Sequence, residues 1–82
     1  MKNKDIIREA ALKAGIITEE EARELEASGM EASFHTAASW KQKGYTIKDG
    51  ETGTEVKLWK KKKDGNSFYL AKAYLYSAEQ VE

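Results

Sequence analysis

Apolar residues at helical spacing predict two helices in the first third of the chain. Between residues 5 and 14 they recur every three or four positions, and Gly15 follows where a left-handed helix end is expected. The segment Thr18-Glu19-Glu20-Glu21 has the pattern of a capping box, in which the first and last side chains bond to each other's backbone amides. A second helix is therefore expected from this box to about Ser28, ending at Gly29. Its apolar stripe is thin.

A third helix is predicted further along the chain, anchored by Trp40. It would begin at Ser33 or Thr36, run to about residue 43 and end at Gly44. A large aromatic residue on a short helix usually packs in the core, so we expect Trp40 to be buried. His35 lies at the predicted helix start without a nucleophile or an acid nearby. A capping or packing role is expected for it, not a catalytic one.

Alternation of apolar and polar residues predicts three strands in the second half, at residues 45–47, 54–62 and 68–76. The dipeptide Asp49-Gly50 lies in the first connection and Asp64-Gly65 in the second, and both are typical of turns. The order of elements predicts an α+β fold, with two or three N-terminal helices followed by a small antiparallel three-stranded meander.

The hairpin register decides which side chains share a face. If Asp64-Gly65 forms a two-residue turn, Trp59 lies opposite Leu70 and Leu58 opposite Ala71. A three-residue loop would invert this partnership, because side chains in a strand alternate with a period of two. In the first case one face gathers Val56, Leu58, Tyr69, Ala71, Ala73 and Leu75, and the other gathers Lys57, Trp59, Lys61, Phe68, Leu70, Lys72 and Tyr74.

Length and composition exclude several classes of function. The chain has 82 residues, which predicts one domain over residues 1–82. It contains no Cys and one His, so a thiol nucleophile, a disulfide or a metal centre is not expected. Neither a signal peptide nor an apolar stretch long enough for a membrane span is present, which favours a cytoplasmic protein without a membrane partner. No catalytic constellation or cofactor motif is visible, and we expect a non-enzymatic protein.

Charge is distributed unevenly along the chain. Residues 1–33 carry five basic and eight acidic side chains, whereas residues 34–82 carry nine basic and six acidic ones. Lysines interleaved with aromatic residues are typical of proteins that bind single-stranded nucleic acid, because the cations meet phosphates and the rings stack on bases. The candidate nucleic-acid-binding residues are Lys41, Lys43, Lys48, Lys57, Trp59, Lys61, Lys62 and Lys63.

The alternative for these residues is an ordinary solvated surface. Lysines in the run 60–63 are common at exposed turns and protect sheet edges from aggregation. Trp59 lies between two lysines, which favours an exposed position. The face opposite Trp59 offers mostly small alanines, so both a covered and an uncovered indole remain open at this point.

Segment 34–53 contains a set of residues whose types and spacing are typical of one protein family. It combines Thr36, the pair Trp40-Lys41, Gly44, the pair Ile47-Lys48 and the pair Gly50-Glu51. In these residues the chain resembles the N-terminal module of ArdC-type antirestriction proteins, which are encoded on plasmids, phages and integrative elements. The residues that follow resemble small single-domain relatives from Gram-positive bacteria. The similar segments are the predicted strand with Leu58-Trp59-Lys60 and the final residues Gln80-Val81-Glu82. The resemblance covers residues 31–82 and leaves residues 1–30 as an acidic helical segment.

The resemblance implies a single-stranded DNA-binding module with an antirestriction role on a mobile genetic element. The family often carries lysines where this chain has Asp49 and Thr52, so the turn has two fewer positive charges and weaker DNA binding is expected. Larger family members also contain a metalloprotease-like domain with a His-Glu-x-x-His motif. That motif is absent here, and its activity is not carried over.

A second hypothesis is that the chain inhibits a host defence nuclease through protein–protein contact, as an anti-restriction or anti-CRISPR factor. The acidic helical segment, and in particular Glu19, Glu20 and Glu24, would then imitate phosphates or meet a basic surface. Binding of single-stranded DNA would depend on the hairpin lysines and Trp59, whereas this inhibition would depend on the acidic helix.

Overall fold

The computed structural model of the protein describes residues 2–82. Two helices, α1 (Asn3–Lys13) and α2 (Glu19–Ser28), precede a sheet whose strands are joined by a third, short helix. The remaining elements are β1 (Phe34–Thr36), α3 (Ala37–Gln42), β2 (Thr54–Lys61), β3 (Phe68–Ser77) and the 3-10 turn η1 (Ala78–Gln80). The sheet is antiparallel with strand order β1-β3-β2, which confirms a small α+β fold with N-terminal helices.

Local capping chemistry fixes the helix ends as the sequence predicts. The backbone amide of Glu21 donates to the hydroxyl of Thr18 at 3.1 Å, and the amide of Thr18 donates to the Glu21 carboxylate at 3.0 Å. Gly29 ends α2 with φ +72°, a conformation that glycine adopts without steric cost. Thr36 caps α3 by accepting a hydrogen bond from the amide of Ser39.

The first strand differs from the sequence-based expectation. The predicted strand at 45–47 contributes only one isolated bridge, between Ile47 and Val81, while the strand that completes the sheet is β1. Phe34 explains the difference, because its fully buried side chain packs with Leu75 in the core. Burial of that ring holds residues 34–36 beside β3, so that β3 and not β2 is the central strand.

The β2–β3 hairpin has the register of the first of the two alternatives left open by the sequence, although its turn is longer than two residues. Leu58 lies opposite Ala71, and Trp59 lies opposite Leu70. Hydrogen bonding continues to the amide of Lys62, which donates to the carbonyl of Ser67 at 2.9 Å, so residues 63–66 form a four-residue tip. This four-residue tip and a two-residue turn at Asp64-Gly65 give the same register, because both are centred between residues 64 and 65.

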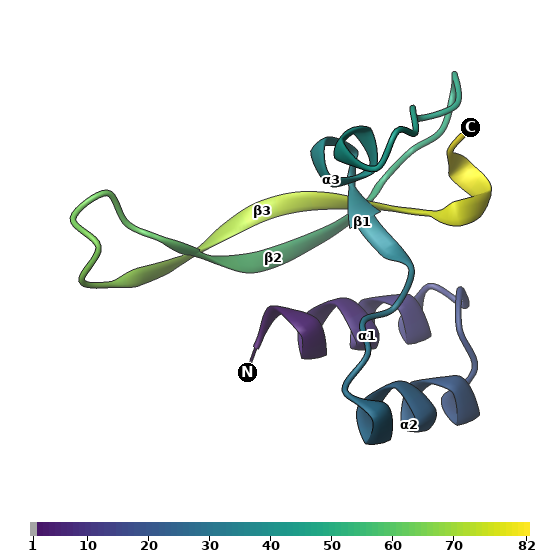
Figure 1. The fold of residues 1–82 in the computed structure, drawn as a ribbon, viewed down its shortest axis with the longest axis horizontal. Coiled ribbons are helices and arrows are strands. Elements are labelled where there is room, and N and C mark those ends of the chain that lie inside the picture. Colours follow the sequence, from purple (N-terminus) through teal and green to yellow (C-terminus); the bar gives the residue numbers. More distant parts are fainter. Residues whose placement is uncertain (1) are drawn as a thin grey trace.

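Helices α1 and α2 lie on one side of the sheet and α3 lies on the other, as Figure 1 shows. The main core forms between α1 and the sheet, where Ala11, Ala32, Phe34 and Leu75 are buried. Side chains from the two N-terminal helices and from β2 pack around this cluster: Ile7, Ala10, Ile17, Leu25, Val56 and Leu58. The acidic helical segment therefore shares its core with the sheet.

A smaller aromatic cluster joins α3 to the opposite face of the sheet. Trp40 is only 5% exposed, as predicted, and its indole N–H donates to the carbonyl of Tyr76 at 2.8 Å. His35 and Tyr45 contact its ring edge-to-face, with centroids at 4.9 and 5.3 Å. His35 thus packs against Trp40, in the role expected for it. Its burial, and secondly the nearby charge of Lys43, lower its pKa below the ordinary 6.5, while Glu31 acts in the opposite direction.

Replacement of Leu75 by Ala tests which side of β3 carries the core. We expect a loss of about 2–5 kcal/mol in the free energy of unfolding, since the side chain is fully buried. Leu70→Ala on the exposed side of the same strand is the matched control, with an expected loss below about 1 kcal/mol. Urea denaturation followed by circular dichroism measures both, and equal losses would contradict the assignment of the two faces.

The position of His35 predicts a pH dependence of stability. The unfolded chain protonates His35 at a higher pH than the folded protein, so its contribution is complete above about pH 6.5 and is lost as the pH falls. The thermal midpoint should therefore decrease between about pH 7 and pH 5, where free carboxylates are still ionised. In His35→Gln this decrease should be smaller, and an unchanged slope would show that another group titrates.

Candidate nucleic-acid interface

One face of the hairpin is not covered by the helices. We call it the hairpin face and define it by seven alternate side chains of β2 and β3 that point away from α1: Lys57, Trp59, Lys61, Phe68, Leu70, Lys72 and Tyr74. Glu55, opposite Tyr74, borders it on the same side of the sheet. All seven are exposed, and the four largest apolar ones are 40% (Trp59), 61% (Phe68), 47% (Leu70) and 47% (Tyr74) exposed. The ribbon extends past α1 and α3 to its free tip (Figure 1), which leaves this face open to solvent.

Trp59 lies at the centre of the β2 side of the hairpin face. Lys57 and Lys61 precede and follow it on the same face, each about 7 Å along the strand. Its cross-strand neighbour is Leu70, which is also exposed. Trp59 is thus partly exposed, at 40%, and has a lysine before and after it on the same face of the sheet, so the first of the two possibilities, a fully covered indole, does not apply.

Two lysines of the hairpin face are directly opposite each other. Lys57 pairs with Lys72 across β2 and β3, and like charges in that position destabilise a sheet. Glu55 offsets part of this repulsion, because its carboxylate lies 3.5 Å from the Lys72 ammonium and also accepts from the Tyr74 hydroxyl at 3.4 Å. Two lysines therefore face each other at the middle of the hairpin face, and one of them is paired with a carboxylate.

Asn3 holds the backbone of Trp59 from the outer edge of the sheet. Its amide nitrogen donates to the Trp59 carbonyl at 3.0 Å, and its oxygen accepts from the Trp59 amide at 2.7 Å. This side chain supplies both bonds that a further strand would make at that residue. Helix α1 therefore fixes the strand that carries the indole and closes the edge at this point.

The tip of the hairpin adds further lysines. The Asp64 carboxylate accepts from the amide of Asn66 at 3.0 Å, and Gly65 has φ +75°, which together shape the turn. A shallow hollow of about 540 Å³ lies here, lined by Lys61, Lys62, Lys63, Asp64 and Tyr69. Lys62 and Lys63 are thus at the end of the ribbon, beyond the hairpin face.

The remaining predicted site residues lie elsewhere. Lys41 and Lys43 are exposed at the end of α3, and Lys48 lies in the loop that follows. The Lys48 ammonium donates to the carbonyl of Glu79 at 3.0 Å, which ties that loop to η1. The eight candidates therefore form two groups, one along β2 and the tip and the other around α3.

The motif residues of segment 34–53 make structural contacts. In addition to the roles of Thr36 and Trp40, Gly44 follows α3 with φ +92°, and Ile47 bridges to Val81. The Glu51 carboxylate accepts from the side-chain amide of Gln80 at 3.0 Å. These contacts attach α3 and its loop to the C-terminal segment, so the motif has a structural function besides any ligand.

Four members of the hairpin face were not among the predicted site residues: Phe68, Leu70, Lys72 and Tyr74. The sequence did place them on the same face as Lys57, Trp59 and Lys61 for one of the two hairpin registers, and this is the register observed. Asn3 had no such signal, because its contact with Trp59 joins residues 56 positions apart. Within residues 2–82 no group of three or more His, Asp or Glu side chains is placed to hold a metal ion, and none of the helices described has the length and apolar character needed to cross a membrane.

Comparison of the chain with protein-family models, with curated proteins and with solved structures found no match.

Replacement of Lys57 by Glu tests whether the pair of Lys57 and Lys72 destabilises the folded protein. An opposite-charge pair with Lys72 should raise the free energy of unfolding by about 0.2–1 kcal/mol, and added salt should reduce the gain. Lys60→Glu is the control, because Lys60 is opposite Tyr69 on the other face. If Lys57→Glu lowers the stability in urea denaturation, the pair is not repulsive.

Proposed function

We propose that the protein is a non-enzymatic module that binds single-stranded nucleic acid, with DNA as its partner, across the hairpin face. The observation that carries the proposal is the exposed indole of Trp59 between Lys57 and Lys61, next to the cross-strand pair of Lys57 and Lys72. A phosphate beside that pair would relieve its repulsion, so an anionic ligand turns an unfavourable contact into a favourable one.

Exposed rings and lysines together suit an unpaired strand. Trp59, Phe68 and Tyr74 offer flat surfaces on which bases stack, and each stacked base contributes about 1–3 kcal/mol. The lysines displace counterions from the phosphates, which makes the affinity depend on salt. Stacking needs no particular base, so we expect little sequence preference.

The tip supports the same proposal. Lys62 and Lys63 extend the cationic stripe beyond β2, and Tyr69 offers one more ring beside them. A strand lying along the ribbon would meet cations over its whole length. The group around α3 contributes less, because Lys48 is already engaged with Glu79.

The proposed biological role rests on the resemblance to ArdC-type modules. Their antirestriction function on mobile genetic elements suggests that this chain protects incoming DNA during its single-stranded stage. The positions of Asp49 and Thr52 favour weak binding, since the family often has lysines there.

The proposal is tested by titrating a fluorescein-labelled oligo-dT strand with the protein and measuring anisotropy at two salt concentrations. Weak binding that decreases with salt is expected. Trp59→Ala should weaken it about tenfold, as expected for the loss of one stacked base. The triple substitution of Lys57, Lys61 and Lys62 by Ala should reduce both the affinity and its salt dependence.

Lys13→Ala is the matched control, because Lys13 is an exposed lysine at the end of α1 and not part of the hairpin. It should leave the affinity unchanged. No binding at low salt, or equal binding by Trp59→Ala and the parent, would overturn the proposal. The inhibitor hypothesis would then become the leading one, and loss of nuclease capture on charge reversal of Glu19, Glu20 and Glu24 would support it.

A further inference from the structure

An apolar groove runs along α2 on the side of the molecule away from the hairpin face. Two hollows of about 490 and 480 Å³ share Ile17, Glu21 and Ser33 in their walls, so they are adjoining parts of one depression. We call it the α2 groove. It extends from the end of α2 and the segment after it, across the α1–α2 connection, to η1.

Several large apolar side chains line the α2 groove. Ile17 and Leu25 are half-buried against the core, while Ile16 is 37% and Met30 is 65% exposed. Met30 lies in the segment between α2 and β1, an exposed position at which a polar side chain could hydrogen-bond to water. Unbranched, polarisable methionine adapts well to varied apolar partners.

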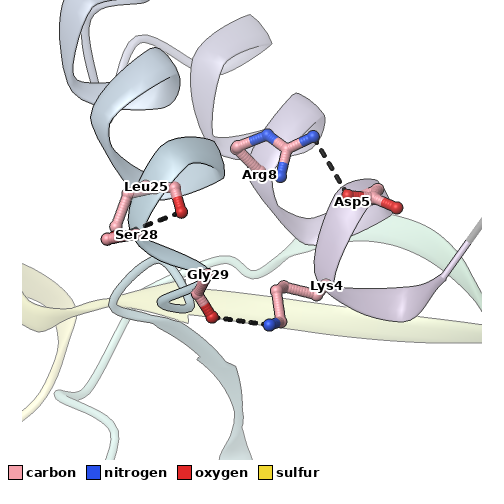
Figure 2. Close-up of polar contacts among 6 residues, drawn as sticks. All are labelled: Lys4, Asp5, Arg8, Leu25, Ser28 and Gly29. Carbon is pink, nitrogen blue, oxygen red and sulfur yellow. Dashed lines mark hydrogen bonds and ion pairs between the residues drawn. The ribbon is translucent and has the colours of Figure 1, made fainter.

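The rim of the groove carries charge of one sign. Every charged side chain among the described residues that line the two hollows is a glutamate: Glu21, Glu24, Glu31 and Glu79. Figure 2 shows the polar contacts of two α1 cations beside α2. Lys4 donates to the carbonyl of Gly29 at 2.6 Å, and Arg8 pairs with Asp5 at 3.0 Å. Neither contact involves a glutamate of the rim.

We propose that the α2 groove binds a cationic amphipathic helix of a partner protein. The apolar face of such a helix would cover Ile17, Leu25 and Met30, and its Lys and Arg side chains would meet the glutamate rim. Helix-in-groove recognition combines these two features, with the apolar contacts giving affinity and the charges giving orientation. A nucleic acid does not fit this surface, because the rim repels phosphates.

The proposal is tested with a labelled peptide in which leucines recur at helical spacing and lysines fill the polar face. Fluorescence anisotropy should show saturable binding to the full chain. In Glu24→Gln/Glu31→Gln the affinity should fall about tenfold, which corresponds to the loss of two exposed ion pairs. Met30→Ser should also weaken binding, with little effect on stability because Met30 is exposed.

The matched control is Glu26→Gln. Glu26 lies on α2 but lines hollows on its other side, so this variant should bind the peptide as the parent does. A peptide with the same leucines and glutamates in place of lysines should not bind. Circular dichroism confirms that each variant is folded. Oligo-dT binding should persist in Glu24→Gln/Glu31→Gln, which separates this proposal from the function of the hairpin face.

Three results would overturn the proposal. The first is equal peptide binding by Glu24→Gln/Glu31→Gln and the parent, and the second is equal binding of the glutamate peptide. The third is concentration-dependent self-association of the parent in sedimentation velocity that Glu24→Gln/Glu31→Gln abolishes. In that case a second copy of the chain, presenting its lysine-rich tip, is the occupant.

Discussion

The pairing of β2 with β3 is the constraint on which the rest of the structure depends. With Leu58 opposite Ala71 and Trp59 opposite Leu70, small and aliphatic residues gather on the side of α1, and rings and lysines gather on the other. Helix α1 contributes enough apolar surface to complete a core with Phe34 and Leu75. Of the helices in residues 2–82, α3 alone lies on the second face, over its end near β1.

Features encoded by neighbouring residues could be predicted from the sequence. The capping box at Thr18 and the helix end at Gly29 depend on short-range chemistry, and the burial of Trp40 was expected from its residue type. The hairpin register was one of two alternatives that the turn sequence left open. The strand at 34–36 could not, because its place is determined by Phe34 packing in a core that is assembled from distant segments. A three-residue strand has too little alternation to be recognised locally.

In the candidate site, too, features set by neighbouring residues could be predicted and features set by distant contacts could not. The two lysines beside Trp59 were visible in the sequence, because they alternate with it along one strand. The backbone support from Asn3 was not, since an asparagine near the beginning of a helix gives no indication of a partner in a distant strand. The lysines around α3 share a charge with those of the hairpin, but composition alone does not reveal that they belong to another region of the surface.

A net charge of zero conceals two surfaces of opposite sign. Six lysines lie on the hairpin and its tip, at 57, 60–63 and 72, whereas glutamates line the α2 groove on the other side of the sheet. The rigid sheet and its core keep the two apart. If both proposals hold, the two ligands have opposite charge and separate sites, and each would be repelled from the surface of the other.

The four-residue tip of the ribbon has a consequence for how the chain tolerates length changes. The pairing of β2 with β3 is held by the side chains packed against α1, so an extra residue in segment 63–66 lengthens the loop and leaves the register in place. An extra residue within β2 has a different effect, because it turns the side chains on one side of the insertion to the opposite face of the sheet. Insertions and deletions should therefore be confined to the tip.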